Sequence, residues 1–307
     1  MKIHVKEKDT LFNILYAKLR PASKTRVRKL IKHGAIALGG QILRMPDHLL
    51  IPGQTISIER PATRPPFSVL YEDPYVIALE KPPGLLSVGT GREEPNTFYR
   101  MVNQYLHLRS NGRERIFIVH RLDREASGIM LFAKTPEIKG ALQRSWGGTE
   151  KRYAALVEGR PPEREGTLKS WLTETPAFKV RSGPKRPGAK FAVTHYRNVK
   201  EYPEYTLLEI RPETGRKNQI RAHLSEMGCP IAGDKKYGAA GNPIRRLALH
   251  AVALSFTHPV SGERLKIESP LPGDFRRLEK QSFQWRPDEQ GATPDRVAHR
   301  VRGPKSK

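Results

Sequence analysis

The sequence contains a single cysteine, Cys229, and no long run of apolar residues. One thiol cannot form an internal disulfide, and it excludes a zinc site built from several thiolates. A membrane-spanning helix needs about 18 consecutive apolar residues, and no stretch of the chain approaches that length. The first residues, MKIHVKEKD, lack the apolar segment of a secretory signal peptide. These absences predict a protein of the reducing cytoplasm.

Acidic residues are scarce relative to basic ones. The 307 residues include 55 lysines and arginines against 31 aspartates and glutamates, which gives a formal net charge of +24. Because a large charge of one sign opposes compact folding by self-repulsion, such an excess indicates an anionic partner. Nucleic acid is the first candidate. An anionic membrane is the second, but no spanning segment supports it, so we expect no membrane partner.

A chain of this length is expected to form about two domains. Residues 1–60 predict a small α/β domain, and the proline-rich residues 61–66 predict an extended linker. Residues 67–280 contain short apolar runs at regular intervals, which predict a larger sheet-based domain. Residues 281–307 have few aliphatic side chains and many charges, so we expect a basic, disordered tail. That tail would tether RNA or serve only as a solubilising end.

Residues 23–34 predict a helix with one apolar face and one basic face. Ser23 can cap its first turn and Gly34 can end it, and the apolar residues at 27, 30 and 31 form a stripe for burial. A hairpin is predicted over residues 35–43. Helix and hairpin resemble the S4 RNA-binding domain, which implies contact with a phosphate backbone, although a merely solvated basic face is the alternative. The cations concerned are Lys24, Arg26, Arg28, Lys29 and Lys32.

Residues 120–128, HRLDREASG, form the most informative polar segment of the chain. Apolar runs on both sides predict a strand, a turn and a second strand, with Asp123 in the turn. The pair Ser127-Gly128 is small enough to let the backbone of another molecule come close. An aspartate in a turn is often a structural cap. However, the adjacent Arg121 and Arg124 can keep the carboxylate ionised, so that it could attack or deprotonate a sugar carbon.

The sequence contains no recognisable cofactor motif. Gly183 and Gly188 have the spacing of a phosphate-binding loop, but Ala189-Lys190 follows where lysine and then serine or threonine are required. The histidines do not fall at the spacing of zinc ligands. We therefore expect neither a metal nor a cofactor.

Further segments carry a family resemblance. EKPPGLLSV stands at residues 80–88, KRY at 151–153, TGRKNQIRAH at 214–223 and GDKKYG at 233–238. With HRLDREASG, and in this order, they resemble the RluA-type pseudouridine synthases over about residues 67–275. Ala126 replaces the usual threonine of the acid motif, and Asn218 replaces the usual histidine of the late motif. An S4 domain ahead of such a catalytic domain is an arrangement known in this family.

The resemblance implies an α+β fold with a mixed, largely antiparallel sheet, and an isomerase that converts uridine in RNA to pseudouridine. The uracil is cut from its ribose carbon, turned and rejoined through its own carbon, so no redox agent or energy donor is needed. Asp123 would be the catalytic carboxylate, as nucleophile or as base. Arg221 would pair with it, and Tyr153 would stack on the uracil and could help with the proton that leaves the base. A surface position for Arg221 and a core position for Tyr153 are the alternatives.

The resemblance also implies residues that bind the substrate. Arg121 would fill the space left by the flipped nucleotide, because extrusion costs a few kcal/mol of stacking. Ile220 would line the base pocket, with a core role as the alternative. The remaining candidates are Arg216, Asn218 and Lys151. Neither Ala126 nor Asn218 replaces a group of the predicted catalytic set, so we expect activity to survive both departures.

The sequence does not name the uridine. An S4-like module favours large-subunit ribosomal RNA over transfer RNA, by analogy alone. We expect a monomer. The alternatives are an inactive RNA-binding relative, which would bind RNA without modifying it, and a basic DNA-binding protein, which only the charge favours.

Overall fold

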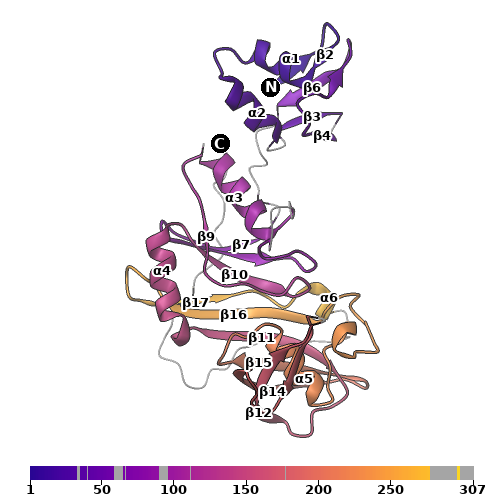
Figure 1. Cartoon of the computed structure of the whole chain (residues 1–307), viewed down its shortest axis with the longest axis vertical. Coiled ribbons are helices and arrows are strands. Elements are labelled where there is room, and N and C mark those ends of the chain that lie inside the picture. Colours follow the sequence, from indigo (N-terminus) through magenta and orange to yellow (C-terminus); the bar gives the residue numbers. More distant parts are fainter. Residues whose placement is uncertain are drawn as a thin grey trace. The chain divides into compact units, whose positions relative to one another are not determined.

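The structure is a computed structural model of the chain, and it divides into two compact units (Figure 1). The first comprises residues 1–66 with 103–114, and the second comprises residues 67–102 with 115–307. The predicted linker and tail lie, apart from residues 65 and 296–297, outside the described residues. The structure describes residues 1–32, 35–39, 41–58, 65, 67–89, 96–110, 112–176, 178–276 and 296–297.

The first unit contains a four-stranded antiparallel sheet in the order β1-β6-β3-β4. A short ladder pairs β2 with β5, and apolar side chains of α1 and α2 fill the core. The elements are β1 (Lys2–His4), β2 (Asp9–Thr10), α1 (Leu11–Lys18), α2 (Lys24–Lys32), β3 (Ile36–Leu38), β4 (Gln41–Leu43), β5 (Leu49–Leu50) and β6 (Thr55–Ile58).

Local sequence explains where these helices begin. The Thr10 hydroxyl accepts a hydrogen bond from the Asn13 amide at 3.3 Å, and the Ser23 hydroxyl accepts one from the Arg26 amide at 3.2 Å. The predicted Ser23 cap and the predicted hairpin over residues 35–43 are thus confirmed. Gly34, the predicted end of the helix, lies outside the described residues.

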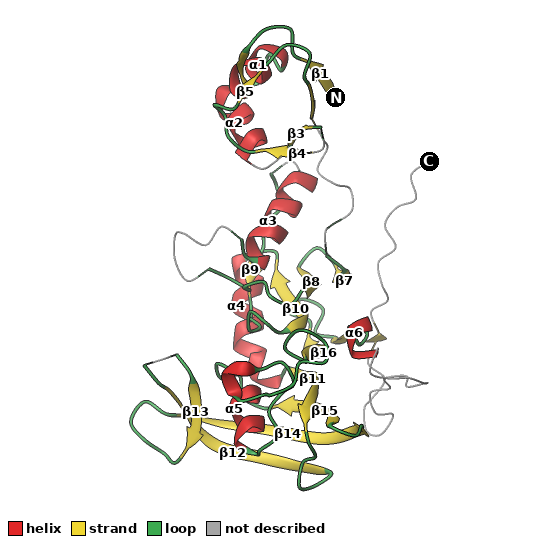
Figure 2. Cartoon of the chain, turned by 90° about the vertical axis from the view of Figure 1, so that its right-hand side faces the viewer, coloured by secondary structure: helices red, strands yellow, loops and turns green. Residues whose placement is uncertain are grey.

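One large mixed sheet organises the second unit (Figure 2). Its order is β13-β12-β14-β15-β11-β16-β10-β8-β7, with β17 beside β16 and β9 beside β10. Along this path the pairs are antiparallel except β10 with β16. The predicted α+β fold with a mixed, largely antiparallel sheet is confirmed. No helix among the described residues has the length and apolar character needed to cross a bilayer.

The strands of this unit are β7 (Val69–Glu72), β8 (Val76–Lys81), β9 (Phe117–Ile118), β10 (Ser127–Ala133), β11 (Glu150–Glu158), β12 (Glu165–Glu174), β13 (Val180–Gly183), β14 (Lys190–Glu201), β15 (Tyr205–Pro212), β16 (Leu249–Thr257), β17 (Arg264–Glu268) and β18 (Arg296–Val297). The remaining helices are α3 (Phe98–Arg109), α4 (Pro136–Ser145), α5 (Gln219–Glu226) and α6 (Gly273–Arg276). Helix α3 contains residues of both units. Single turns of 3₁₀ helix lie at Trp146–Gly148 and Lys235–Tyr237.

Helix α4 covers a hydrophobic core on one face of the sheet. Its Leu142 is buried with Ile129, Leu131 and Phe256 of β10 and β16. Thr135 caps the helix: its hydroxyl accepts a hydrogen bond from the Ile138 amide at 3.3 Å, and proline occupies the first turn. This packing fixes the strands that lead into the polar segment around residue 123.

Candidate active site

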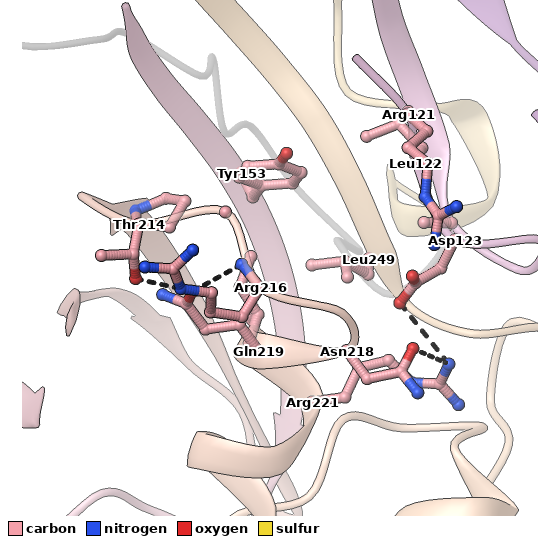
Figure 3. Close-up of a pocket in the computed structure, with 14 residues that line it drawn as sticks. Arg121, Leu122, Asp123, Tyr153, Thr214, Arg216, Asn218, Gln219, Arg221 and Leu249 are labelled. Carbon is pink, nitrogen blue, oxygen red and sulfur yellow. Dashed lines mark hydrogen bonds and ion pairs between the residues drawn. The ribbon is translucent and has the colours of Figure 1, made fainter. Parts of the chain in front are cut away.

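A pocket in the second unit brings together most of the predicted site residues (Figure 3). It holds about 530 Å³ of empty space, part of it open to solvent. Ligand sites commonly measure about 300–1,000 Å³. The loop before β10, strand β11 and the segment around the start of α5 form its walls. Among its lining residues are Arg121, Asp123, Tyr153, Arg216, Asn218, Ile220 and Arg221.

A buried lysine holds the loop that carries Asp123. The ammonium group of Lys81, at the end of β8, donates hydrogen bonds to the backbone carbonyls of Arg124 at 3.0 Å and Ala126 at 2.8 Å. It also donates to the carbonyl of Pro82 at 2.8 Å. Burial lowers the pKa of Lys81 to about 8, while the nearby carboxylates oppose that shift. The turn that lacks the usual threonine at Ala126 is therefore fixed through its backbone.

Two more contacts fix the same loop. The Ser87 hydroxyl donates to the carbonyl of Leu122 at 2.6 Å and accepts from its amide at 3.0 Å. Gly128 has a φ of +112°, and a Cβ built there would lie 2.4 Å from the carbonyl oxygen of Ala251. Only glycine fits this position. At Gly128 the backbone that comes close is that of β16 in the same chain, so the predicted approach of another molecule is wrong at this position.

Helix α5 brings Arg221 beside the carboxylate. Its Nη1 lies 3.5 Å from Oδ2 of Asp123. Its Nε and Nη2 donate to the two carboxylate oxygens of Asp234 at 2.6 and 2.7 Å. The Tyr237 ring centroid lies 4.9 Å from the guanidinium carbon. Such a two-bond pair fixes the plane of the guanidinium, so one nitrogen is aimed at Asp123. Arg221 is buried, which is not the position of a surface helix residue.

Asn218 precedes α5 and also touches the carboxylate. Its φ of +51° lies in the left-handed region, which asparagine tolerates better than most residues. With the amide nitrogen toward Asp123, it donates to both carboxylate oxygens at 3.0 and 3.2 Å, and its oxygen accepts from the Tyr237 hydroxyl at 3.2 Å. This orientation gives each amide atom a suitable partner. Asn218 thus supports the carboxylate, and its predicted contact with substrate stays a prediction.

Two residues of the TGRKNQIRAH segment fasten α5 to the sheet. The amide of Gln219 donates to the Thr194 hydroxyl at 2.9 Å, and its oxygen accepts from the Arg216 amide at 3.0 Å. His223 forms hydrogen bonds with the hydroxyls of Thr194 and Ser170, both at 2.9 Å. Sequence reasoning assigned no role to Gln219 or His223. These contacts show that the motif positions Ile220 and Arg221 between two anchors.

A β-bulge directs Tyr153 toward the pocket. In the ladder with β16, Arg152 pairs with Ala253 and Tyr153 pairs with Ala251, so the register shifts between them. Paired residues of neighbouring strands share a face, and residues 251 and 253 lie on the same face. The bulge therefore places Lys151 and Tyr153 on opposite faces of β11.

Lys151 is not among the residues that line the pocket, and its predicted role in substrate binding stays a prediction. Its ammonium lies 5.9 Å from the ring centroid of Trp146, which stacks on His120 at 4.8 Å. The Nε2 atom of His120 accepts a hydrogen bond from the Leu131 amide at 2.9 Å. Burial, helped by the charge of Lys151, lowers the pKa of His120 to about 3, so this ring is neutral. These contacts favour a structural role for His120.

Burial also shapes the chemistry of the pocket. It raises the pKa of Asp123, and Arg221 opposes the shift without cancelling it. The Asp123 side chain is 28 % exposed, so a substrate can reach it. Burial and the charge of Asp123 raise the pKa of Tyr153, which keeps the phenol protonated at neutral pH. A carboxylate with a raised pKa is a better base, provided that it is ionised at the working pH.

The other predicted residues differ in burial. Ile220 is 8 % exposed and lines the pocket, so it can contact a base while packing in the core. Arg121 and Arg216 are exposed at the pocket. Within the ranges that the structure describes, no group of three or more histidine, cysteine or acidic side chains could hold a metal ion.

Solved structures share the fold over much of this chain. Human RNA pseudouridylate synthase domain containing 4 superposes with a TM-score of 0.57 at 23 % sequence identity, over 69 % of this chain and 93 % of that one. Human RNA pseudouridylate synthase domain containing 1 gives 0.56 at 21 % identity, over 72 % and 98 %. The fold is thus that of the pseudouridylate synthases.

Sequence comparison gives the family. Residues 75–226 match the family model described as RNA pseudouridylate synthase. The ribosomal large subunit pseudouridine synthase D of Xanthomonas campestris is 34 % identical over an alignment that covers 87 % of each chain. The uncharacterized RNA pseudouridine synthase YjbO of Bacillus subtilis is 35 % identical, over 78 % of this chain and 85 % of the relative. The chain belongs to the RNA pseudouridine synthases of the RluA type, which are isomerases.

Proposed function

We propose that this enzyme converts uridine to pseudouridine in large-subunit ribosomal RNA, with Asp123 as its catalytic carboxylate. The main support for the proposal is the pocket itself, in which Nη1 of Arg221 lies 3.5 Å from Oδ2 of Asp123. The choice of RNA is supported by relatives named ribosomal large subunit pseudouridine synthase D, from Xanthomonas campestris and Vibrio cholerae.

In this proposal Asp123 acts on the ribose of a flipped uridine. It attacks the carbon that holds the base, or it removes a proton from the neighbouring carbon, and either step requires the ionised carboxylate. Arg221 and Asn218 hold the carboxylate in one orientation, so little rearrangement is needed when the substrate arrives. The freed uracil then turns and rejoins through its ring carbon, which finally loses its proton.

Tyr153 and Arg121 complete the proposed site. Because the pKa of Tyr153 is raised, its phenol is a poor proton acceptor at neutral pH, which favours stacking on the uracil. Arg121 is exposed at the pocket, where a cationic side chain can replace the stacking that the RNA loses when a nucleotide flips. Ile220 supplies an apolar wall for the base.

The first unit would hold the RNA. The cations of α2 are exposed, and two of them lie over rings of α1: Arg28 is 5.0 Å from the Phe12 ring centroid and Lys24 is 5.8 Å from that of Tyr16. This basic surface supports the proposal that residues 1–60 act as an S4-like RNA-binding module. A monomer acting in the cytoplasm is part of the same proposal.

Mapping pseudouridines in cells tests this function. Total RNA from cells with and without the gene should differ at one or a few uridines of the large-subunit ribosomal RNA. A plasmid copy should restore them, whereas a copy with Asp123→Asn should not. Loss of a transfer RNA site instead would refute the proposed substrate. An unchanged map would refute the proposed function.

A further inference from the structure

A second pocket adjoins the one that contains Asp123. The two pockets share Gly215 and Arg216, and the second holds about 710 Å³ of empty space. Strands β12, β13 and β14 and the loop before α5 form its walls. The catalytic steps proposed above use none of this space. An RNA strand that enters the active pocket can therefore continue into the second one.

The second pocket lies in a region of positive charge. Residues 175–191 contain five lysines and arginines and no acid. Lys190, Arg216 and Lys217 line the pocket, and its acidic member, Glu174, pairs with Lys217. Lys190 and Arg216 thus leave the lining with a net positive charge. Such a lining attracts a phosphate group.

An exposed aromatic ring stands beside these cations. Phe178, in the turn between β12 and β13, is 69 % exposed, and the ammonium of Lys217 lies 5.5 Å from its ring centroid. A phenyl ring that faces water gains no burial energy. Lys217 also lines the second pocket, so the ring lies next to that pocket.

The backbone holds Phe178 in an unusual conformation. Its φ of +55° is a genuine outlier for a bulky residue, and glycine would adopt it without strain. The Phe178 amide donates to the Thr175 carbonyl at 2.8 Å, and Lys236 donates to the Phe178 carbonyl at 2.8 Å. These two hydrogen bonds hold the backbone of Phe178. Because backbone strain costs stability, a strained residue on the surface can indicate a functional position.

We propose that the second pocket binds the nucleotide next to the target uridine. Its base stacks on Phe178, and its phosphate lies against Lys190 and Arg216. Aromatic stacking of this kind accepts any base, because each base presents a flat face. The inference rests on the proposed function, since it assumes that the first pocket takes a uridine from RNA.

Phe178→Gly removes the ring without adding backbone strain. It should raise the KM for a large-subunit RNA fragment that contains the mapped uridine by about tenfold, which is in the range expected for one base stacked on an aromatic ring. The kcat at saturating RNA should change much less, and the melting temperature should not fall. Phe178→Tyr restores a ring and should recover most of the affinity that Phe178→Gly removes.

A matched control and a modified substrate complete the test. Tyr75→Ala removes another exposed ring, 38 % exposed in the turn between β7 and β8, and should leave KM unchanged. A second fragment carries an abasic residue in place of the nucleotide that is proposed to stack on Phe178. The wild type should bind this fragment about tenfold more weakly than the intact one. Phe178→Gly should lose almost nothing further, because the stacking partner is already gone.

The outcomes separate the two proposals. If Phe178→Gly binds the fragment as tightly as the wild type does, or if it loses as much again on the abasic fragment, the inference is wrong. Fragment binding is measured directly, so this result does not depend on turnover. If the wild type modifies no uridine, the proposed function fails on its own.

Discussion

The Asp123 loop and helix α2 are both proposed to meet RNA, but their charged side chains are held in different ways. Buried partners fix Asp123. The ammonium of Lys81 donates hydrogen bonds to two carbonyls of its loop, and the guanidinium of Arg221 lies beside its carboxylate. The α2 cations are exposed, and Arg28 and Lys24 lie over aromatic rings. Chemistry requires a fixed geometry, whereas attraction of phosphate requires only charge. Changes near Asp123 should therefore affect kcat, and changes on α2 should affect affinity.

The largest effect is expected at the tightest contact of the Asp123 loop. Gly128→Ala adds a Cβ that would lie 2.4 Å from the Ala251 carbonyl, at a φ of +112°. We expect a loss of roughly 3 kcal/mol or more in the free energy of unfolding, and loss of activity. Denaturant titration and a turnover assay measure both. Gly159→Ala is the control, because it meets only the strain of a φ of +70° with no atom within 4 Å. Equal effects of both substitutions would contradict the argument from close approach.

The next effect should come from the partner of Arg221. Asp234→Asn breaks the two-bond pair that aims the guanidinium, and a misplacement of about 1 Å can cost about 100-fold in rate. We expect kcat to fall by about that factor with little change in KM. Since Asp234 also raises the pKa of Asp123, the acid limb of the rate profile should move to lower pH.

The control for Asp234 is a similar ion pair outside the pocket. Asp274 accepts from Nε and Nη2 of Arg246 at 2.6 and 3.0 Å. Asp274→Asn should reduce stability without moving the acid limb. A raised KM with an unchanged kcat for Asp234→Asn would show that it binds RNA instead of positioning Arg221.

A smaller effect on turnover is expected from α2. Replacing its five cations, Lys24, Arg26, Arg28, Lys29 and Lys32, by alanine should weaken RNA binding, with kcat at saturating RNA changing far less than KM. Each phosphate that the variant no longer binds should reduce the slope of log affinity against log salt by about one. A double variant, Lys139→Ala with Arg144→Ala on α4, controls for the loss of positive charge elsewhere on the protein. An unchanged slope for the α2 variant would refute the RNA contact.

The smallest expected change is a shift along the pH axis. The ionised carboxylate of Asp123 is required, so activity should fall as the pH drops through its pKa. Because burial raises that pKa above the usual 3.8, the acid limb should lie at a higher pH than for an ordinary aspartate. Arg221→Gln removes the cation that opposes the shift, so the limb should move higher still. A kcat/KM profile with an acid limb at the ordinary value would contradict this account.

Strong local patterns made part of the structure predictable. The helix capped by Ser23, the apolar strand after Gly128 and the turn with Asp123 depend on neighbouring residues, and the sequence shows them directly. The hairpin of β12 and β13 was missed. Most β12 side chains are half-buried or exposed, so its sequence lacks the apolar alternation that marks a strand.

The unpredicted parts of the site depend on contacts between distant residues. Lys81 reaches carbonyls more than 40 positions away in the sequence, and nothing near it marks its burial. Asp234 was recognised only as part of a motif, and its bond to Arg221 depends on the fold. Lys151 and Tyr153 are two residues apart, so in a regular strand their side chains would lie on the same face. The bulge places them on opposite faces instead.

The central claim is that one carboxylate, fixed beside Arg221, performs the reaction. Its most direct test compares purified wild type and Asp123→Asn on the same large-subunit RNA fragment in a single turnover, with binding measured in parallel. We predict that the wild type forms pseudouridine and that Asp123→Asn forms none while binding the fragment with similar affinity. Pseudouridine formation by Asp123→Asn at a rate near that of the wild type would contradict the account.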